Sequence, residues 1–463
     1  MTDIFNMEEE INGLTSDLQN KITINITNPT ELNYKLIEAI DEGEEGVEFG
    51  DEEENHDHIA LPQGYYPQQS AKPIKIGNRQ RRKSSIVSSY EVNISNSYVS
   101  SSLIINKSPV NNKIQPPRLS DFEPIKVLGK GSYGKVLLVR EISSGKLYAQ
   151  KQLKKASLII NEDTNEVHEK NYQRTLNEKQ ILELVNHQNI VKLYYAFQDN
   201  NKLYLILEYL DGGELFHHLA MEKFMSEKNA SYYIAQMVLA LRYLHVNLKV
   251  IYRDLKPENC MLNSSGNLVL TDFGLSKVSS DDDKKNHSMT GTAQYMAPEI
   301  LKGEPYDYSV DWWSLGCVAF DLLTGSPPFT GNNHKKIMEK IIQSKKTLKF
   351  PFYLSLDAKD FLRKLLQVNP DKRFNVDGEF EKFKKHRFFR YVNWKELENL
   401  EEHDVLPPIL PIITDPILAE NFDSEFTDMA FTPQTGSNFL DKDILNIKGF
   451  SYTNPKFIDS LGL

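Results

Sequence analysis

Cysteine is scarce in this chain of 463 residues, and long apolar runs and an excess of positive charge are lacking. Its two cysteines, Cys260 and Cys317, cannot build a disulfide framework, which favours a reducing compartment. The apolar run at 203–207 is as long as any other and is far shorter than the roughly 18 residues that a membrane span needs. The formal net charge of −10 argues against a general nucleic-acid or membrane-surface binder, and the first residues lack the pattern of a targeting segment. We therefore expect a soluble protein of the cytoplasm, with the nucleus as a further compartment.

Residues 1–120 differ in composition from the rest of the chain. They are rich in asparagine, serine and acidic residues, and negative charge is nearly continuous at 41–54. Periodic apolar patterns are weak, so burial of apolar side chains would not offset the entropy lost on ordering. We predict that this part is a mostly disordered regulatory region.

From residue 121 the pattern becomes that of a folded domain. Short β-type runs come first, at 125–128, 136–139, 147–153 and 203–207. Helical spacing appears at 177–185 and later dominates, at 230–245, 310–323, 335–343 and 357–368. Strands followed by helices predict an α+β fold, with a small sheet-rich lobe before a larger helical lobe. Beyond about residue 390, proline-rich and aromatic-dotted segments indicate a tail at 390–463.

The glycines Gly129, Gly131 and Gly134 are the first candidates for nucleotide binding. Such a cluster by itself is more often a simple turn. A dinucleotide-binding fingerprint would lead into a helix, whereas a strand-like run follows at 136–139. The phosphate loop of other nucleotide enzymes needs a hydroxyl where Val136 stands. The remaining interpretation is a strand–turn–strand hairpin whose bare backbone covers the phosphates of ATP.

Two charged residues downstream suit this interpretation. Lys151 lies on a following β-type run and can pair with the α- and β-phosphates. Glu178 lies on the first predicted helix and can hold the lysine in place. Each of them alone is more often an ordinary surface charge.

The segment 252–259, Tyr-Arg-Asp-Leu-Lys-Pro-Glu-Asn, carries the strongest chemical signal. Asp254 is suited to accept the proton of a substrate hydroxyl, and Lys256 to neutralise charge on the transferring phosphate. Asn259 can hold Mg²⁺ together with Asp272 of the following Asp-Phe-Gly sequence. These residue types are needed because the transition state places negative charge on three phosphate oxygens, which cations and fixed dipoles must stabilise.

Residues 122–389 resemble the eukaryotic protein kinase domain, and their details resemble its AGC group. Two sequences are typical of that group: Tyr-Arg-Asp at 252–254 and Gly-Gly-Glu-Leu-Phe at 212–216. Within the group, the p70 ribosomal protein S-six kinase family is most similar in the segments 195–198, 202–210 and 296–299. The resemblance implies a bilobal serine/threonine protein kinase that uses ATP and Mg²⁺. It also implies a buried pair between Glu299 and Arg373.

The same resemblance assigns the substrate sites. The adenine would lie against the hinge at 208–210, behind Leu207. The implied ATP-binding residues are Leu128, Gly129, Gly131, Gly134, Val136, Ala149, Lys151, Glu178, Glu208, Leu210 and Met261. Glu214 and Glu258 would bind arginine of the peptide substrate, because carboxylates form two-pronged pairs with guanidinium, and solvated surface charge is the alternative. We therefore expect protein substrates with basic residues upstream of Ser or Thr.

A regulatory phosphosite is implied between Asp272 and Glu299. Ser288 matches the activation-loop site of the AGC group. Its phosphate would add nearly two negative charges. By the resemblance, Arg174, Arg253 and Lys277 would bind it, and the phosphoinositide-dependent kinase would add it.

The tail is implied to carry two more phosphosites. Thr432 matches the turn motif and Ser451 the hydrophobic motif, the latter modified by a TOR complex. Ile447 and Phe450 would fill a groove behind the helix of Glu178. Isoleucine replaces the usual first phenylalanine, so weaker docking is expected by about 1 kcal/mol. We expect the protein to act as a monomer.

Other interpretations stay open. A protein kinase B or serum-and-glucocorticoid-type kinase is one, although residues 1–120 are too acidic and too poor in strands for the lipid-binding domain with which protein kinase B begins. A pseudokinase scaffold is another, although no catalytic residue is missing. Ser84 follows a basic stretch and is a candidate autophosphorylation or pseudosubstrate site, with a nuclear-import signal or a plain basic patch as alternatives. Phe5 opens an acidic stretch similar to a TOR docking signal, for which chance is the alternative.

Overall fold

A computed structural model gives the architecture of the domain. It describes residues 117–131, 134–155, 169–219, 223–278, 292–399, 406–430, 447 and 449–455. The predictions for Ser288, Thr432, Ser84 and Phe5 and for nearly all of 1–120 lie outside the described residues. Within the ranges described, every helix is too short or too polar to span a bilayer.

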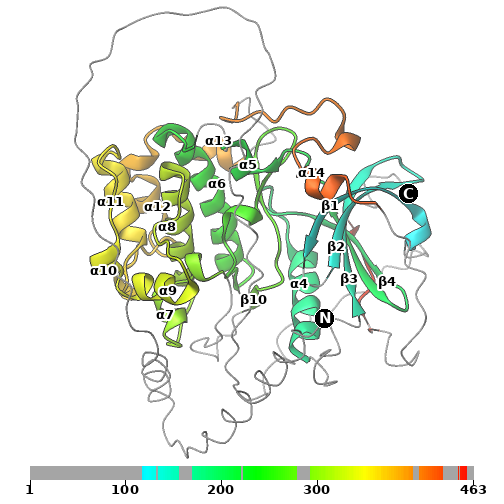
Figure 1. Ribbon diagram of the computed structural model, residues 1–463, viewed down its shortest axis with the longest axis horizontal. Helices are drawn as coiled ribbons and strands as arrows, with labels where there is room; N and C mark the ends of the chain where they lie inside the picture. The colour runs from blue at the N-terminus through cyan, green and yellow to red at the C-terminus, as the bar shows by residue number, and fades with distance from the viewer. Residues whose placement is uncertain are drawn as a thin grey trace, which may run out of the picture. The chain divides into compact units, whose positions relative to one another are not determined.

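A six-stranded antiparallel sheet forms the first lobe (Figure 1), and its strands follow the order β1-β2-β3-β5-β4-β11. The bounds are β1 Phe122–Gly131, β2 Gly134–Glu141, β3 Leu147–Lys154, β4 Leu193–Gln198, β5 Lys202–Glu208 and β11 Tyr452–Thr453. The four predicted strands lie within β1, β2, β3 and β5, whereas β4 and β11 were not predicted. The helix α4 Glu169–Leu184 packs against β4. It begins eight residues before the predicted start at 177. The prediction missed this part because the first two turns of the helix are polar and show no apolar period.

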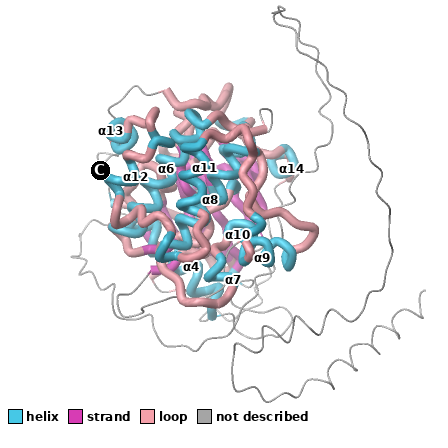
Figure 2. The backbone as a smooth tube through the Cα atoms, turned by 90° about the vertical axis from the view of Figure 1, so that its left-hand side faces the viewer, coloured by secondary structure: helices cyan, strands magenta, loops and turns pink. Residues whose placement is uncertain are grey.

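Helices dominate the second lobe, as predicted. Those of ten residues or more are α6 Glu227–Val246, α8 Ser309–Thr324 and α11 Leu356–Leu365, and α8 packs against both others (Figure 2). Side chains cap several helices, for example Ser226 at α6 and Ser355 at α11. The shorter helices are α5 Leu215–His218, α7 Pro298–Leu301, α9 His334–Ile342, α10 Ser344–Thr347, α12 Phe380–Lys384 and α13 Trp394–Glu398. The α11 helix ends three residues before the predicted end at 368, because Leu366 leaves the helical conformation.

Two small sheets carry the segments between the lobes. One has the order β6-β8-β9, with β6 Gly213–Glu214, β8 Cys260–Leu262 and β9 Leu268–Leu270. The other pairs β7 Val250–Ile251 with β10 Lys277–Val278. The chain between β7 and β8 contains the 3-10 helix η2 Pro257–Asn259, and the chain between β9 and β10 contains Asp272. Both predicted catalytic segments are therefore loops that are fixed at each end by strands.

The described part of the tail returns to the first lobe. Its short helix α14 Ser424–Thr427 contacts β1 (Figure 1). The ring of Phe422 stacks on Tyr209 in the hinge, with centroids 5.9 Å apart. The Tyr209 hydroxyl donates to the carbonyl of Pro416, 2.9 Å away. The tail thus packs against the chain segment that joins the lobes and hydrogen-bonds to it.

Candidate active site

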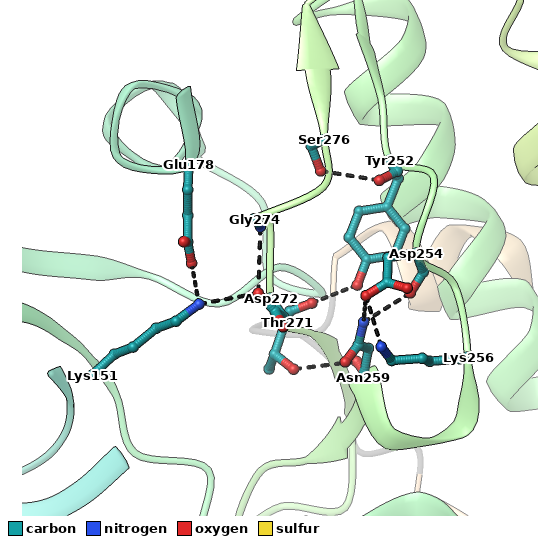
Figure 3. Close-up of polar contacts among 10 residues, drawn as sticks. All are labelled: Lys151, Glu178, Tyr252, Asp254, Lys256, Asn259, Thr271, Asp272, Gly274 and Ser276. Carbon is teal, nitrogen blue, oxygen red and sulfur yellow. Dashed lines mark hydrogen bonds and ion pairs between the residues drawn. The ribbon is translucent and has the colours of Figure 1, made fainter. Parts of the chain in front are cut away.

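Lys151 brings together three elements that are far apart in the sequence. It lies in β3, opposite Val136 of β2 and Leu205 of β5. Its Nζ is 2.6 Å from Glu178 Oε1 on α4 and 3.0 Å from Asp272 Oδ1 on the loop after β9 (Figure 3). The predicted pair is therefore formed, and the predicted metal-binding carboxylate joins it.

The charges of this cluster support one another. Burial opposes the charged lysine, but the carboxylates of Asp272 and Glu178 outweigh it and raise the pKa of Lys151. The ammonium of Lys151 in turn lowers the pKa of Asp272. Burial raises the pKa of Glu178, against the effect of Lys151. The carboxylate of Asp272 consequently stays negative at neutral pH, which is the state that a cation requires.

Asp254 lies within the helical lobe with one oxygen engaged and the other unpartnered. Its Oδ2 accepts from Lys256 Nζ at 2.9 Å and from Asn259 Nδ2 at 2.9 Å (Figure 3). Its Oδ1 is buried and has no hydrogen-bond partner among the described residues. An orphaned buried carboxylate oxygen is costly, so its retention indicates a function. Burial raises the pKa of Asp254 to about 6, although Lys256 opposes the rise.

A buried aspartate that the sequence analysis missed holds the catalytic loop in place. Asp311 of α8 accepts hydrogen bonds from the backbone N–H groups of Tyr252 and Arg253, both at 2.8 Å. Arg253 has a φ of 64°, a conformation that is uncommon for a non-glycine residue and needs such support. His245 lies between Asp311 and Asp377, at 2.8 and 3.0 Å. Burial opposes its charge, but the two carboxylates prevail and raise its pKa to about 9.

Tyr252 packs in the interior, as expected for a residue that takes no part in proton transfer. It is fully buried, and its ring lies 5.1 Å from that of Phe273. Its hydroxyl donates to the carbonyl of Thr271, and Ser276 Oγ donates to its carbonyl at 3.1 Å (Figure 3). The catalytic loop and the loop of Asp272 are thereby joined side by side.

The predicted apolar walls of the nucleotide site lie on four strands of the large sheet and on β8 of a small sheet. Leu128 packs with Val136 and Ala149 in one cluster, and Ala149 lies opposite Leu207. Met261 lies in β8, opposite Glu214. The hinge residues Glu208 and Leu210 follow β5, and burial raises the pKa of Glu208.

The three glycines of the hairpin have different physical requirements. A Cβ at Gly129 or Gly131 would meet no atom of the described residues within 4 Å, so there is open space beside their backbone. A Cβ at Gly134 would collide with the carbonyl of Gln152 in β3. Gly134 is therefore required by packing within the sheet, whereas Gly129 and Gly131 leave room for a ligand.

The acidic pair expected to bind the peptide is exposed on neighbouring elements. Glu214 lies at the end of β6, and Glu258 in η2, which contacts β6. Burial raises the pKa of the Cys260 thiol, and the carboxylates of Glu258 and Glu214 add to this rise.

The expected phosphate ligands are described, but their phosphosite is not. Arg253 Nε donates to the carbonyl of Leu275 at 2.7 Å. Lys277 lies in β10, and Arg174 lies in α4 one turn before Glu178. Their convergence on Ser288 stays a prediction. The expected pair of Glu299 and Arg373 is present and buried, with nitrogen–oxygen distances of 2.7 and 3.0 Å.

The hydrophobic motif lies where the sequence analysis expected it. Ile447 and Phe450 are buried in the same hydrophobic cluster as Ile181 of α4. The side chain of Gln198 donates to the carbonyl of Ile447 at 2.7 Å and accepts from its N–H at 2.9 Å. Ser451 is exposed at a cavity of about 350 Å³, whose lining includes Gln198 and Arg118. Arg118, which precedes the predicted domain, was not foreseen.

Comparisons with known proteins agree with this geometry. The family model of the protein kinase domain matches residues 122–389. The serine/threonine-protein kinase YPK3 of Saccharomyces cerevisiae is 44% identical over 391 residues, which cover 72% of this chain and 74% of that protein. Ribosomal protein S6 kinase alpha-6 of Danio rerio is 44% identical over 343 residues, which cover 73% of this chain and 44% of that protein. Ribosomal protein S6 kinase alpha-1 of Homo sapiens is 42% identical over 344 residues, which cover 72% of this chain and 44% of that protein. The chain thus spans less than half the length of these vertebrate relatives. It belongs to the protein kinase family, as a serine/threonine protein kinase of the AGC group close to the ribosomal protein S6 kinases.

Proposed function

We propose that this kinase transfers the γ-phosphoryl group of ATP to Ser or Thr in protein substrates that carry basic residues upstream. The observation that carries the proposal is the buried Oδ1 of Asp254, which has no hydrogen-bond partner among the described residues. Its carboxylate lies near the cluster of Lys151, Glu178 and Asp272 (Figure 3). A substrate hydroxyl that donates to this oxygen would satisfy it. The enzyme would then orient the hydroxyl for attack and receive its proton.

The residues present fit a magnesium-bound nucleotide. Protein kinases generally use ATP and Mg²⁺, and Mg²⁺ prefers oxygen ligands from one or two carboxylates together with substrate phosphates. Asp272 supplies a carboxylate whose pKa is lowered by Lys151. The amide nitrogen of Asn259 donates to two oxygens of Asp254, so its amide oxygen is the group left to act as a ligand. When bound, the cation would neutralise charge that develops on the phosphates.

Lys151 and Lys256 would supply the remaining positive charge. Lys151 would contact the α- and β-phosphates and would be held for this by Glu178. Lys256, already 2.9 Å from Asp254, would bind the transferring group and keep the nearby carboxylate ionised. The pKa of Asp254, near 6, leaves it unprotonated at neutral pH and more basic than an ordinary aspartate.

Regulation by three phosphosites is part of the proposal and rests on the resemblance to the AGC group. The phosphoinositide-dependent kinase would modify Ser288, and a TOR complex would modify Ser451, with Thr432 as the turn-motif site. A phosphate on Ser451 would lie near Gln198 and Arg118, whose guanidinium suits phosphate. Such a kinase would act in the cytoplasm, and also in the nucleus, in a growth-signalling pathway.

A peptide scan with purified full-length protein tests this proposal. We expect phosphorylation to require arginine or lysine upstream of the acceptor, and the double variant Glu214→Gln/Glu258→Gln to lose this preference while it still phosphorylates other peptides. The variant Glu304→Gln changes an exposed carboxylate elsewhere and is the control. Selection that is unaltered in the double variant would refute the assigned peptide site.

A further inference from the structure

The tail continues beyond the hydrophobic motif and adds a strand to the sheet. After Phe450, the residues of β11 pair antiparallel with β4, Tyr452 opposite Ala196 and Thr453 opposite Tyr195. Without β11, β4 would be the edge of the sheet and would leave a row of backbone groups unpaired. The roles expected for the tail concern Ile447, Phe450 and Ser451, and none of them involves the pairing of β11 with β4.

Asn454 fixes the end of this strand through two groups at once. Its backbone N–H donates to the carbonyl of Tyr194 at 2.9 Å. Its side-chain Nδ2 donates to the carbonyl of Leu193 at 3.0 Å. Both acceptors belong to the beginning of β4. Alanine at this position could make only the first of these bonds.

The end of β4 near Gln198 and the helix α4 also bind the backbone of the preceding tail residues, in addition to the burial of the Ile447 and Phe450 side chains. Gln198, the last residue of β4, makes both a donor and an acceptor bond to Ile447. Lys179 of α4, the neighbour of Glu178, donates to the carbonyl of Gly449 at 2.8 Å. These contacts, like those of Asn454, involve no atom of the Ser451 side chain.

We propose that β4, Gln198, Lys179 and Asn454 form a clasp that keeps the hydrophobic motif on α4 without a phosphate on Ser451, and that Asn454 is a positioning residue for the Lys151–Glu178 pair. The chain of contacts runs from Asn454 to the docked tail, from the tail to α4, and from α4 to Lys151. The inference rests on the proposed control of this kinase by its tail. The clasp compensates for isoleucine in place of the usual first aromatic residue of the motif.

Two attachments acting on one docking equilibrium make a specific prediction. While either the clasp or the phosphate is intact, the tail is mostly docked, so loss of one changes the docked fraction little. Loss of both shifts the equilibrium to the undocked state. Ser451→Ala should therefore retain kcat within about threefold of the parent, whereas Ser451→Ala/Asn454→Ala should lose about tenfold or more, a change that needs only about 1.4 kcal/mol.

The experiment compares full-length parent, the two single variants and the double variant with a basic peptide at saturating ATP. Deuterium uptake of α4 is followed in parallel. We expect the double variant to show lower kcat and faster exchange in α4 with unchanged KM for the peptide, because Glu214 and Glu258 lie in other elements. Asn454→Asp keeps the shape but replaces the donor by an acceptor, and on the Ser451→Ala background it should reproduce the loss. Asn332→Ala, an exposed asparagine of the helical lobe, is the control on the same background.

The outcomes separate the clasp from the proposed function. If Ser451→Ala alone abolishes activity, docking depends on the phosphate and the clasp is refuted. If the double variant equals Ser451→Ala in kcat and in exchange, Asn454 has no positioning role. An inactive parent protein that carries a phosphate on Ser288 would contradict the proposed function itself.

Discussion

Substitution of Arg373 by alanine should destabilise the helical lobe strongly. The guanidinium binds both oxygens of Glu299, at 2.7 and 3.0 Å, and the two side chains are only 1% and 2% exposed. It also donates to the carbonyls of Ser309 and Gln367 and lies 5.4 Å from the ring of Trp313. Alanine would leave the Glu299 carboxylate buried without a partner. Removal of one member of such a pair costs about 3–5 kcal/mol.

That loss is large for a folded domain. Total stabilities are about 5–15 kcal/mol, and 1 kcal/mol corresponds to roughly 2–4 °C in Tm for domains of about this size. We therefore expect Arg373→Ala to lower Tm by about 6–20 °C in scanning calorimetry. The double variant Glu299→Gln/Arg373→Met removes the unpaired charge and refills part of the volume, so it should recover part of the loss.

Arg387→Ala is the matched control. Its guanidinium is 83% exposed and lies 3.7 Å from Asp357, so the change should cost less than about 0.5 kcal/mol. Equal Tm values for Arg373→Ala and Arg387→Ala would refute the argument that the buried pair supports the substrate-facing segment.

Three further predictions concern docking of the tail and catalytic activity. Phe450→Ala should weaken tail docking by about 3–5 kcal/mol, since the side chain is fully buried, and should speed deuterium exchange in α4. Phe352→Ala, at a residue that is 92% exposed, should leave this exchange unchanged. Equal exchange in the parent and both variants would contradict the groove assignment. Ser288→Ala should reduce kcat at least about tenfold, because a phosphate there would make charge-assisted bonds with cations, and unchanged turnover would mean that the loop orders without phosphate. The kcat/KM for ATP should fall as pH drops below about 6, where Asp254 becomes protonated. Lys256→Met should move this inflection to higher pH, because the lysine lowers the pKa of Asp254. An inflection at the same pH in both proteins would show that Lys256 is not the partner of Asp254.

The candidate catalytic residues could be identified from the sequence because their types and order are constrained by the chemistry that we propose. Lys151, Glu178 and Asp272 are separated by up to 121 residues, yet each has a distinctive role that a motif reveals. The strands β1, β2, β3 and β5 were predicted because their apolar runs are local signals. Their registers are fixed only when the strands pair.

The supporting network could not be predicted in the same way. Asp311, His245 and Asp377 look like ordinary polar residues on helices and loops, and their function appears only when packing brings them together across 66 and 132 residues of sequence. The short strand β11 carries no periodic pattern, since two residues are too few to show one. Asn454 is likewise defined by carbonyls of a distant strand.

The most direct test of phosphoryl transfer at this site is the rate at which full-length Asp254→Asn phosphorylates a basic serine peptide from radiolabelled ATP. The amide cannot accept the proton of the substrate hydroxyl, so we expect kcat to fall by about 10²–10⁴-fold, while Asp371→Asn, at an exposed position, keeps the rate of the parent. Turnover by Asp254→Asn within about threefold of the parent would contradict the assignment of the catalytic base and with it the proposed mechanism.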